Sequence, residues 1–412
     1  MRRKTFIVLL IFIFVTVLYF VFFYKDKTLR FVPKNADAVV LVDVKKLTGQ
    51  YISSLAAHPS LWFESMGKDK DAVSLKDAGM KIPDFFQIFH LKNTKFSDWY
   101  SVIELKDQKK FLTFLKQHKF ADKGKNLFQK GQIFIKIERG NCILGTSDAA
   151  FENISQLLFR SSEKNTFDAD QFMHHTLGSV SFISGQKIQN FSIELDDDEI
   201  EIKNSSKQDV LISLLDKEQQ KTQFLDLELN AENIKLYTSF FNKSLADSAQ
   251  INYCKASAEL EQVNDTIISY SYDDDFNEIE KKSYQKIIQP NYAIALKSSS
   301  PQKTWVYFQN KKWINDRNQF TGIPFQPNVI SENKNAFEIK STRRPVQLSK
   351  SLKENYIFIR NTSLLSSSFS TLPASEKKII SNIDYIFYGN SGQDYYVKLK
   401  AKKEKLPLIL RW

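Results

Sequence analysis

The chain has 412 residues, of which 42% are hydrophobic and 25% are charged, and its net charge is +11. Its 34 phenylalanines and 16 tyrosines supply the apolar area that a folded core needs, which excludes wholesale disorder. Two cysteines exclude a disulfide scaffold and a four-ligand zinc site built from cysteine. The basic charge lies at the two ends, with +5 over residues 1–30 and +8 over 341–412, while residues 31–340 carry about −2. Because nucleic-acid binders present a broad basic face, we expect no nucleic-acid partner.

Residues 6–24 form an unbroken run of 19 residues without a charge. A helix of this length crosses a hydrocarbon core of about 30 Å. The alternative is a cleaved signal peptide, but the run is longer than the usual apolar region of about 7–15 residues, and no small-x-small cleavage site follows. We therefore expect residues 1–30 to be a short cytoplasmic tail and an uncleaved signal anchor in the inner membrane, in contact with the lipid bilayer through residues 6–24. The basic flanks favour a cytoplasmic N-terminus and a periplasmic or exterior ectodomain, although basic residues on both sides of the run make this bias weak.

Behind the anchor, strands and helices alternate up to about residue 160. A short β-branched run predicts a buried strand, followed by a helix that ends before a proline. A second strand leads into a helix that Asp107 can cap, and a hairpin then leads into a helix that Ser147 or Asp148 can cap. The expected elements are a strand at 39–42, a helix from 43 to about 57, a strand at 99–105, a helix after 107, a hairpin over 133–144 and a helix after 148.

Beyond the polar stretch 160–170, which we take as a domain boundary, strands dominate. The pattern predicts an α+β ectodomain, mostly antiparallel sheet with helices packed on it, divided into an α+β subdomain at 31–165 and a β-rich α+β subdomain at 166–412. A loose echo of residues 32–39 at 289–296 suggests a degenerate repeat. The expected strands are 179–183, 191–195 with 200–202, 224–229 ahead of a helix that Asn230 caps, 256–263 paired with 266–272 across Asn264-Asp265, 356–359, and 383–388 paired with 395–401.

The stretch from Val32 to Leu47, directly after an anchor, resembles uncharacterised families of membrane-anchored exported bacterial proteins, known only as domains of unknown function. The strand-to-helix step at 100–107, the segment 140–150 and the hairpin 385–401 are similar to parts of those families. The resemblance covers about residues 31–160 well and the remainder poorly. It implies export, anchoring and an α+β fold, and it implies no reaction, because the shared motifs concern packing and turns.

No linear motif for a catalytic nucleophile, a zinc protease, a redox dithiol or a phosphate-binding loop is present in the sequence. Matches to S-x-x-K, such as those starting at Ser161 and Ser375, occur without the S-D-N and K-T-G motifs that a penicillin-recognising enzyme needs. The neighbouring His174 and His175 point apart on any regular element, so they do not form a metal pair without further ligands. We therefore predict no catalytic, cofactor-binding or metal-binding residue, no cofactor and no enzymatic activity.

Lysines alternate with apolar residues along the last predicted strand and continue beyond it. Such a row can contact anionic lipid head groups, or it can protect the edge of a sheet against unwanted pairing. The candidate membrane-surface residues are Lys398, Lys400, Lys402, Lys403 and Lys405.

Three functions compete on this sequence. The favoured one is a non-enzymatic extracytoplasmic scaffold or interaction role with an envelope protein partner. The alternatives are a module that binds a lipid or a small ligand in an apolar cavity, and an envelope enzyme that uses carboxylates, which leave no linear motif.

Overall fold

The structure is a computed structural model, and it describes residues 24–60, 77–160, 167–204, 208–241, 249–272, 276–323, 328–344, 346–352, 354–369 and 372–411. The chain forms two compact units. Unit 1 runs to Asn204 and also contains the chain from Glu404 onward, whereas unit 2 runs from Ser205 to Lys403. The boundary that the sequence predicts near residue 165 therefore lies within unit 1, and the chain crosses between the units twice.

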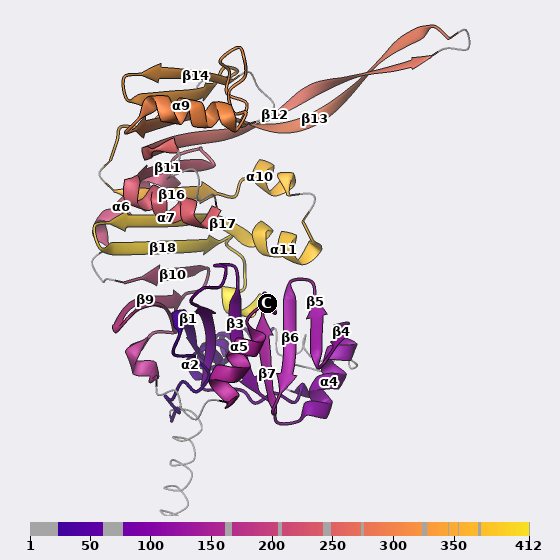
Figure 1. Cartoon of the computed structure of the whole chain (residues 1–412), viewed down its shortest axis with the longest axis vertical. Helices are drawn as coiled ribbons and strands as arrows, with labels where there is room; N and C mark the ends of the chain where they lie inside the picture. The colour runs from indigo at the N-terminus through magenta and orange to yellow at the C-terminus, as the bar shows by residue number, and fades with distance from the viewer. Residues whose placement is uncertain are drawn as a thin grey trace, which may run out of the picture. The chain divides into compact units, whose positions relative to one another are not determined.

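Unit 1 is built on an antiparallel sheet with the strand order β4-β5-β6-β7-β3-β2-β1-β8-β9-β10 (Figure 1). Its helical segments are α2 (Val44–Ala57), α4 (Gln108–Gln117), α5 (Phe151–Ser155), the π-helical turn η2 (Gln156–Arg160) and the 3-10 turns η3 (Ala169–Gln171) and η4 (Leu408–Leu410). The strands are β1 (Ala36–Asp43), β2 (Phe85–Leu91), β3 (Trp99–Glu104), β4 (Ala121–Gly124), β5 (Leu127–Lys130), β6 (Ile133–Glu138), β7 (Asn141–Gly145), β8 (Gly178–Ser184), β9 (Lys187–Leu195) and β10 (Glu199–Lys203).

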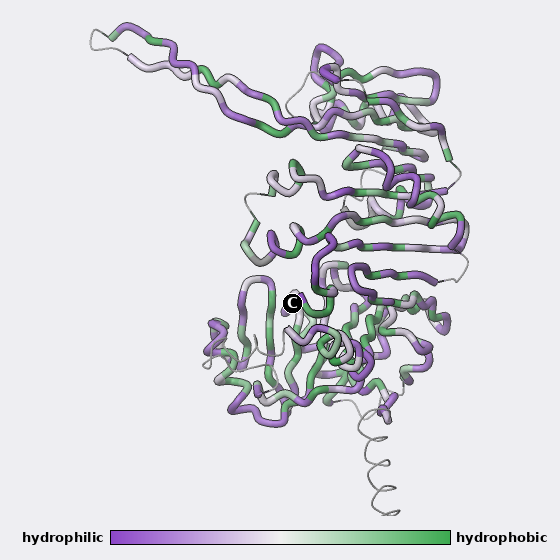
Figure 2. The backbone as a smooth tube through the Cα atoms, turned by 180° about the vertical axis from the view of Figure 1, so that it is seen from behind, coloured by the Kyte–Doolittle hydropathy of each residue, from purple (hydrophilic) through white to green (hydrophobic). Residues whose placement is uncertain are grey.

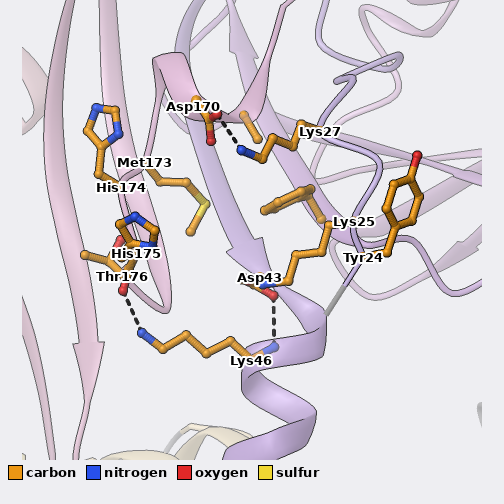
Figure 3. A pocket seen from close by; sticks show the side chains of 12 residues that line it. Tyr24, Lys25, Lys27, Asp43, Lys46, Asp170, Met173, His174, His175 and Thr176 are labelled. Carbon is orange, nitrogen blue, oxygen red and sulfur yellow. Dashed lines mark hydrogen bonds and ion pairs between the residues drawn. The ribbon is translucent and has the colours of Figure 1, made fainter. Parts of the chain in front are cut away.

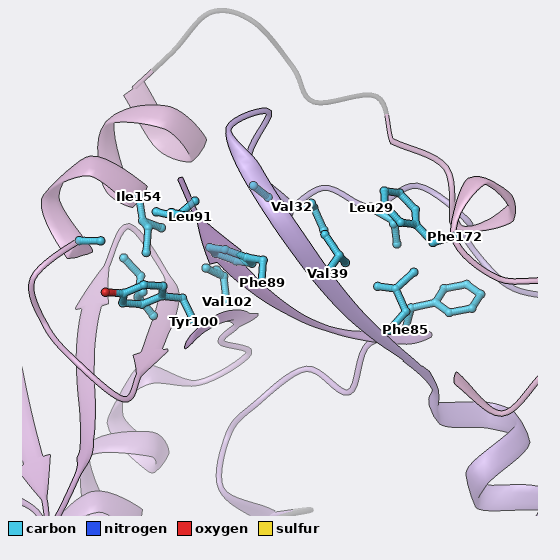
Figure 4. Packing of buried hydrophobic residues seen from close by; sticks show 14 of the residues in the cluster. Leu29, Val32, Val39, Phe85, Phe89, Leu91, Tyr100, Val102, Ile154 and Phe172 are labelled. Carbon is cyan, nitrogen blue, oxygen red and sulfur yellow. The ribbon is translucent and has the colours of Figure 1, made fainter. Parts of the chain in front are cut away.

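The step from β1 to α2 shows how the sequence produces this unit. Val39 and Leu41 on β1 are fully buried, and they belong to a core that also contains Phe89 and Tyr100 (Figure 4). At the end of the strand the carboxylate of Asp43 accepts a hydrogen bond from the backbone N–H of Lys46, which caps the helix. The predicted strand, the predicted helix and its end at Ala57 are all confirmed.

Unit 2 is also an antiparallel sheet, with the strand order β14-β15-β13-β12-β11-β16-β17-β18. Its helices are α6 (Asp209–Gln219), α7 (Ala231–Phe241), α9 (Pro301–Asn310), α10 (Ser363–Ser368) and α11 (Ala374–Asn382). The strands are β11 (Leu225–Asn230), β12 (Ile251–Tyr272), β13 (Glu278–Ser298), β14 (Asn328–Asn333), β15 (Ala336–Ser341), β16 (Asn355–Arg360), β17 (Ile383–Ser391) and β18 (Asp394–Ala401).

Apolar clusters contact two sets of helices in unit 2. Ile234 of α7 and Phe308 of α9 belong to one cluster with strand residues such as Phe337. Leu211 and Leu215 of α6 belong to a second cluster, which contains buried aromatic residues of β16, β17 and β18. The α+β architecture of antiparallel sheet with packed helices is thus present in each unit.

The two units share one topology. Without β4 and β5, unit 1 has eight strands, as unit 2 does. When the strands of each unit are numbered one to eight along the chain, their order across the sheet is 4-5-3-2-1-6-7-8 in both units. In both units a helix follows the first strand and another follows the third. The counterpart of β1 is β11, so the echo at 289–296, which lies in β13, does not follow this shared order. Asp43 and Asn230, the last residues of the equivalent strands, each accept a hydrogen bond from the backbone N–H three residues later.

Two local predictions are wrong. Asn264 and Asp265 do not form a turn, because β12 continues through them to Tyr272 and Asn264 pairs with Lys286. A two-residue hairpin turn requires positive φ at both central positions in type I′ or at the first one in type II′, and without a glycine the Asn-Asp pair yields to continued strand pairing. Neither Ser147 nor Asp148 is the N-cap of α5, which is Ala150 without a side-chain cap.

The predicted anchor at residues 6–24 lies outside the described residues except for Tyr24. Within the described ranges, no helix is both long enough and apolar enough to span a bilayer.

Glu138 provides a test of the electrostatics of unit 1. Although burial by itself raises the pKa of this carboxyl, hydrogen bonds from Ser155, Arg160 and Lys136 lower the pKa from 4.5 to about 2. A lowered pKa stabilises the fold above the unfolded-state pKa, and that stability is lost as pH falls towards the folded value. We expect Glu138→Gln to reduce the free energy of unfolding by about 1–3 kcal/mol at pH 7.

This deficit should shrink as the pH falls from about 4.5 towards 2, because the wild-type carboxylate then becomes protonated. Urea unfolding of both proteins between pH 7 and pH 3.5 measures the difference, and Glu332→Gln, at an exposed residue of β14, is the control. A deficit that stays constant over this range would contradict the prediction.

Candidate functional site

Residues 24–32, which we call the docked segment, directly follow the apolar run and are held against unit 1. The backbone N–H of Asp26 donates to Asp84 at 2.8 Å, and Leu29 N donates to the carbonyl of Phe167 at 2.9 Å. Leu29 and Val32 are fully buried. The chain therefore enters the fold of unit 1 from residue 24 onward rather than through an extended linker.

A pocket of about 830 Å³ lies beside this segment (Figure 3). Its walls come from four separate parts of unit 1: the start of the docked segment, the junction of β1 with α2, the start of β2, and the chain from η3 to β8. Apolar side chains, including Phe85 and Met173, form part of the wall. The polar wall consists of Lys25, Lys27, Asp43, Lys46, Asp170, His174, His175 and Thr176.

Two ion pairs hold four of the charged side chains that line the pocket. Lys25 forms an ion pair with the almost fully buried Asp43, and Lys27 pairs with Asp170 at 2.6 Å. Lys46 differs from these two lysines, because its Nζ donates to the backbone carbonyl of His175 at 2.8 Å, and it forms no ion pair among the described residues. The lining thus carries one positive charge that no carboxylate neutralises.

A second feature is the hairpin of β12 and β13 in unit 2. Residues up to Ala258 of β12 pair with β11, and β13 pairs with β15 from Ala293 onward. Beyond these points the two strands pair with each other out to Tyr272 and Glu278, and the ribbon extends away from the body of unit 2 (Figure 1). We call residues 263–287, as far as they are described, the arm.

The arm exposes large apolar side chains. Residues paired across two strands share a face, and alternate residues along a strand do so too. This places Tyr270, Tyr272 and Tyr284 on one face, where they are 62%, 69% and 75% exposed. Phe276, two residues before β13, is 85% exposed. In Figure 2 hydrophobic residues interrupt hydrophilic ones along both strands. The full sequence of residues 263–287 carries a net charge of −3, which comes from residues 273–275, because the charges of the other residues cancel.

Unit 2 also contains buried carboxylates, which bear on a carboxylate enzyme. Glu218 and Asp226 are almost fully buried, and both contact Lys221, at 2.7 and 2.9 Å. Burial raises the pKa of Glu218. Because Lys221 already occupies the position between the two acids, a reacting group would have to displace it.

A second buried pair joins Glu228 to Lys255 at 2.6 Å. The Glu228 carboxylate also accepts hydrogen bonds from the hydroxyls of Tyr253 and Ser351 and from the backbone N–H of Leu352. This network satisfies the buried carboxylate within the protein, which is the arrangement of a structural ion pair.

The structure divides the predicted row of lysines. Lys398 and Lys400 lie on β18 and are half-buried, whereas Lys402, Lys403 and Lys405 follow the strand and are exposed. Lys405 belongs to unit 1 and the other four belong to unit 2. The row is therefore not one continuous face of a strand, and its contact with a membrane stays a prediction.

The remaining candidate residues do not form a metal site in the described part of the chain. His174 and His175 both line the pocket, with a positive φ of 53° at His175, and in the described part of the chain no group of three or more His, Cys, Asp or Glu side chains is placed to hold a metal. Ser161 lies outside the described residues. The apolar segment after Lys405 packs on unit 1, where Leu408 is buried and its N–H donates to the carbonyl of Asp197.

Sequence reasoning missed the pocket because its walls come from segments about 20 and 130 residues apart. Lys46 in the first turn of α2 was visible in the sequence, but nothing in the pattern placed it near His175. The exposed tyrosines of the arm were missed because a turn was wrongly predicted at Asn264-Asp265. That prediction assigned Tyr270 and Tyr272 to a short hairpin.

Comparison with known proteins found no match to any family model, to any curated protein or to any solved structure.

The cysteines give a direct test of the packing. Cys142 and Cys254 are both free thiols, and burial raises the pKa of each, to about 12 for Cys254. Because the reactive species is the thiolate, we expect neither to react with Ellman's reagent in the folded protein and two thiols per chain to react after denaturation. Fewer than two thiols in denatured, unreduced protein would contradict this prediction and indicate a disulfide.

Proposed function

We propose that this protein is a non-enzymatic, single-pass membrane-anchored envelope protein that binds a protein partner through its arm. The anchor is residues 6–24, with the N-terminus in the cytoplasm and both units in the periplasm or outside the cell. The observation that carries the proposal is the exposure of the aromatic residues of the arm. The docked segment supports the anchor, because it fastens the chain to unit 1 directly after the apolar run.

The arm is suited to binding a partner, because without one its exposed apolar side chains do not stabilise the protein. A two-stranded ribbon has little stability of its own, and large exposed apolar side chains are usual at interaction surfaces. Tyrosine adds contact area at low cost in side-chain entropy and supplies a hydroxyl for hydrogen bonding. The backbone edges of the ribbon can also pair with a strand of a partner.

The negative charge of the full sequence 263–287, which comes from residues 273–275, favours a different protein over a second copy. Two identical arms packed together would bring like charges close, which is unfavourable. We therefore propose an envelope protein with a basic or neutral groove as the partner.

The anchor is tested by membrane extraction. We expect the full-length protein to stay in the membrane pellet after alkaline carbonate washing, because about 19 apolar residues span the hydrocarbon core. Replacing Leu10, Phe14 and Leu18 by Asp should release it or prevent its insertion. Recovery of the wild-type protein in the carbonate supernatant would contradict the anchor.

The arm is tested by a variant in which Tyr270, Tyr272, Phe276 and Tyr284 are all changed to Ser. Since these side chains are exposed, we expect the free energy of unfolding to change by less than about 1 kcal/mol. If they form the centre of the interface, the affinity for the partner should fall at least about thirtyfold, which corresponds to about 2 kcal/mol. Native mass spectrometry of the protein extracted in mild detergent measures the stoichiometric complex.

A control variant carries Tyr51→Ser and Ile82→Ser, which remove exposed apolar side chains of unit 1 outside the arm. It should keep the complex. Equal loss of the partner in both variants, or a partner that is a second copy of this chain, would contradict the proposal.

A further inference from the structure

We propose that the pocket beside the docked segment binds the phosphate-bearing head group of an anionic membrane phospholipid. This inference rests on the proposed anchor, because the anchor is what would bring the pocket close to the bilayer. It goes beyond partner binding by the arm, since it assigns a second, separate site in unit 1.

The charges of the pocket fit an anion. Two of its lysines are matched by the two carboxylates of the lining, so they contribute little net charge. Lys46 is the lysine that no carboxylate of the lining matches. Among the described residues its Nζ donates only to a backbone carbonyl, and a phosphate oxygen is a stronger acceptor than a carbonyl. His174, exposed on the wall formed by the chain from η3 to β8, adds a further donor (Figure 3).

The apolar part of the wall fits a lipid better than a free phosphate. Phe85 and Met173 are themselves buried, and they face the same space as Lys46. A volume of about 830 Å³ exceeds what inorganic phosphate needs and falls within the range of small-molecule sites. A glycerophosphate head group would place its phosphate at the cations and its glycerol against the apolar wall.

The position of the pocket identifies the source of the ligand. Tyr24, the last residue of the uncharged run, is part of the lining, and Lys25 and Lys27 follow it. With residues 6–24 in the bilayer, Tyr24 lies at the interface, where aromatic residues with a polar end are favoured. A phospholipid could then reach the pocket without leaving the membrane.

The shared topology shows that the fold does not require this pocket. In unit 2 the corresponding corner, at the end of β11 and the start of β16, contains a hydrogen-bonded cluster of buried side chains. Asn355 accepts from the backbone N–H of Asn230 at 2.6 Å, and Asn233 donates to Asn390 at 3.2 Å and accepts from the hydroxyl of Tyr388 at 2.7 Å. Unit 1 has charged and apolar side chains around open space at the same place in the topology.

The test uses the full-length protein, extracted in mild detergent and depleted of lipid. It is titrated with palmitoyl-oleoyl phosphatidylglycerol or with the corresponding phosphatidylcholine, and bound lipid is counted by native mass spectrometry. We expect phosphatidylglycerol to bind at least about tenfold more tightly. Lys46→Glu should lower this affinity at least about tenfold, because it replaces the one lining lysine that no carboxylate neutralises with a negative charge.

Lys92→Glu is the matched control, since it makes the same change of charge in unit 1 at an exposed residue outside the pocket. His174→Glu is a second variant on another wall, which keeps the test valid if Lys46→Glu does not fold. Equal binding of the two lipids, or equal effects of Lys46→Glu and Lys92→Glu, would overturn the proposal.

Glycerol 3-phosphate is the competitor that separates the two sources of phosphate. Displacement of phosphatidylglycerol by an equimolar amount of glycerol 3-phosphate would assign the site to a soluble ligand and overturn the lipid proposal. Failure of the anchor would be seen separately, as recovery of the wild-type protein in the carbonate supernatant.

Discussion

The structure of unit 1 depends most on the interactions of one group, the carboxylate of Asp43. It ends β1, caps α2 through the N–H of Lys46 and pairs with Lys25 of the docked segment. One almost fully buried side chain thus fixes the start of a helix, holds the chain that follows the apolar run and forms a wall of the pocket. Loss of this carboxylate would leave Lys25 without its ion-pair partner and the first turn of α2 without its cap.

The same corner in unit 2 shows what a shared topology can and cannot preserve. Asn230 keeps the capping geometry, with a hydrogen bond from the N–H three residues later. It is uncharged, however, and its neighbours are the amides of Asn233, Asn355 and Asn390. Capping needs only a short side chain with an acceptor oxygen, so either Asp or Asn meets that need. An ion pair needs the charge, so only the corner in unit 1 can hold a lysine in this way.

Local signals in the sequence were sufficient where a cap or an apolar period fixes an element. The strand and helix around Asp43, the helix after Asp107 and the hairpin of β17 and β18 were predicted on such signals and are present. The sequence signal failed at Asn264-Asp265, because long-range pairing with β13 outweighed a weak turn signal. Helix α6 was missed altogether, although Leu211 and Leu215 lie on one face of it. Strand β2 was missed too, although its run from Phe85 to Leu91 is apolar except for Gln87 and His90.

The candidate sites were harder to predict from the sequence than the fold was. The pocket depends on bringing together Lys27, Lys46 and His175, and no periodicity in the sequence encodes that contact. The aromatic face of the arm follows from the register of β12 with β13, which places Tyr270, Tyr272 and Tyr284 on the same side. Only an alignment of two strands more than 20 residues long reveals that these side chains form one surface.

The path of the chain has a mechanical consequence. Unit 2 is inserted into unit 1, with one covalent crossing after Asn204 and another before Glu404, where the chain returns and packs on unit 1. A pull on the arm would therefore reach unit 1 through two polypeptide connections, and each connection would bear part of the load. A single proteolytic cut at either crossing would leave unit 2 attached, and only two cuts would release it.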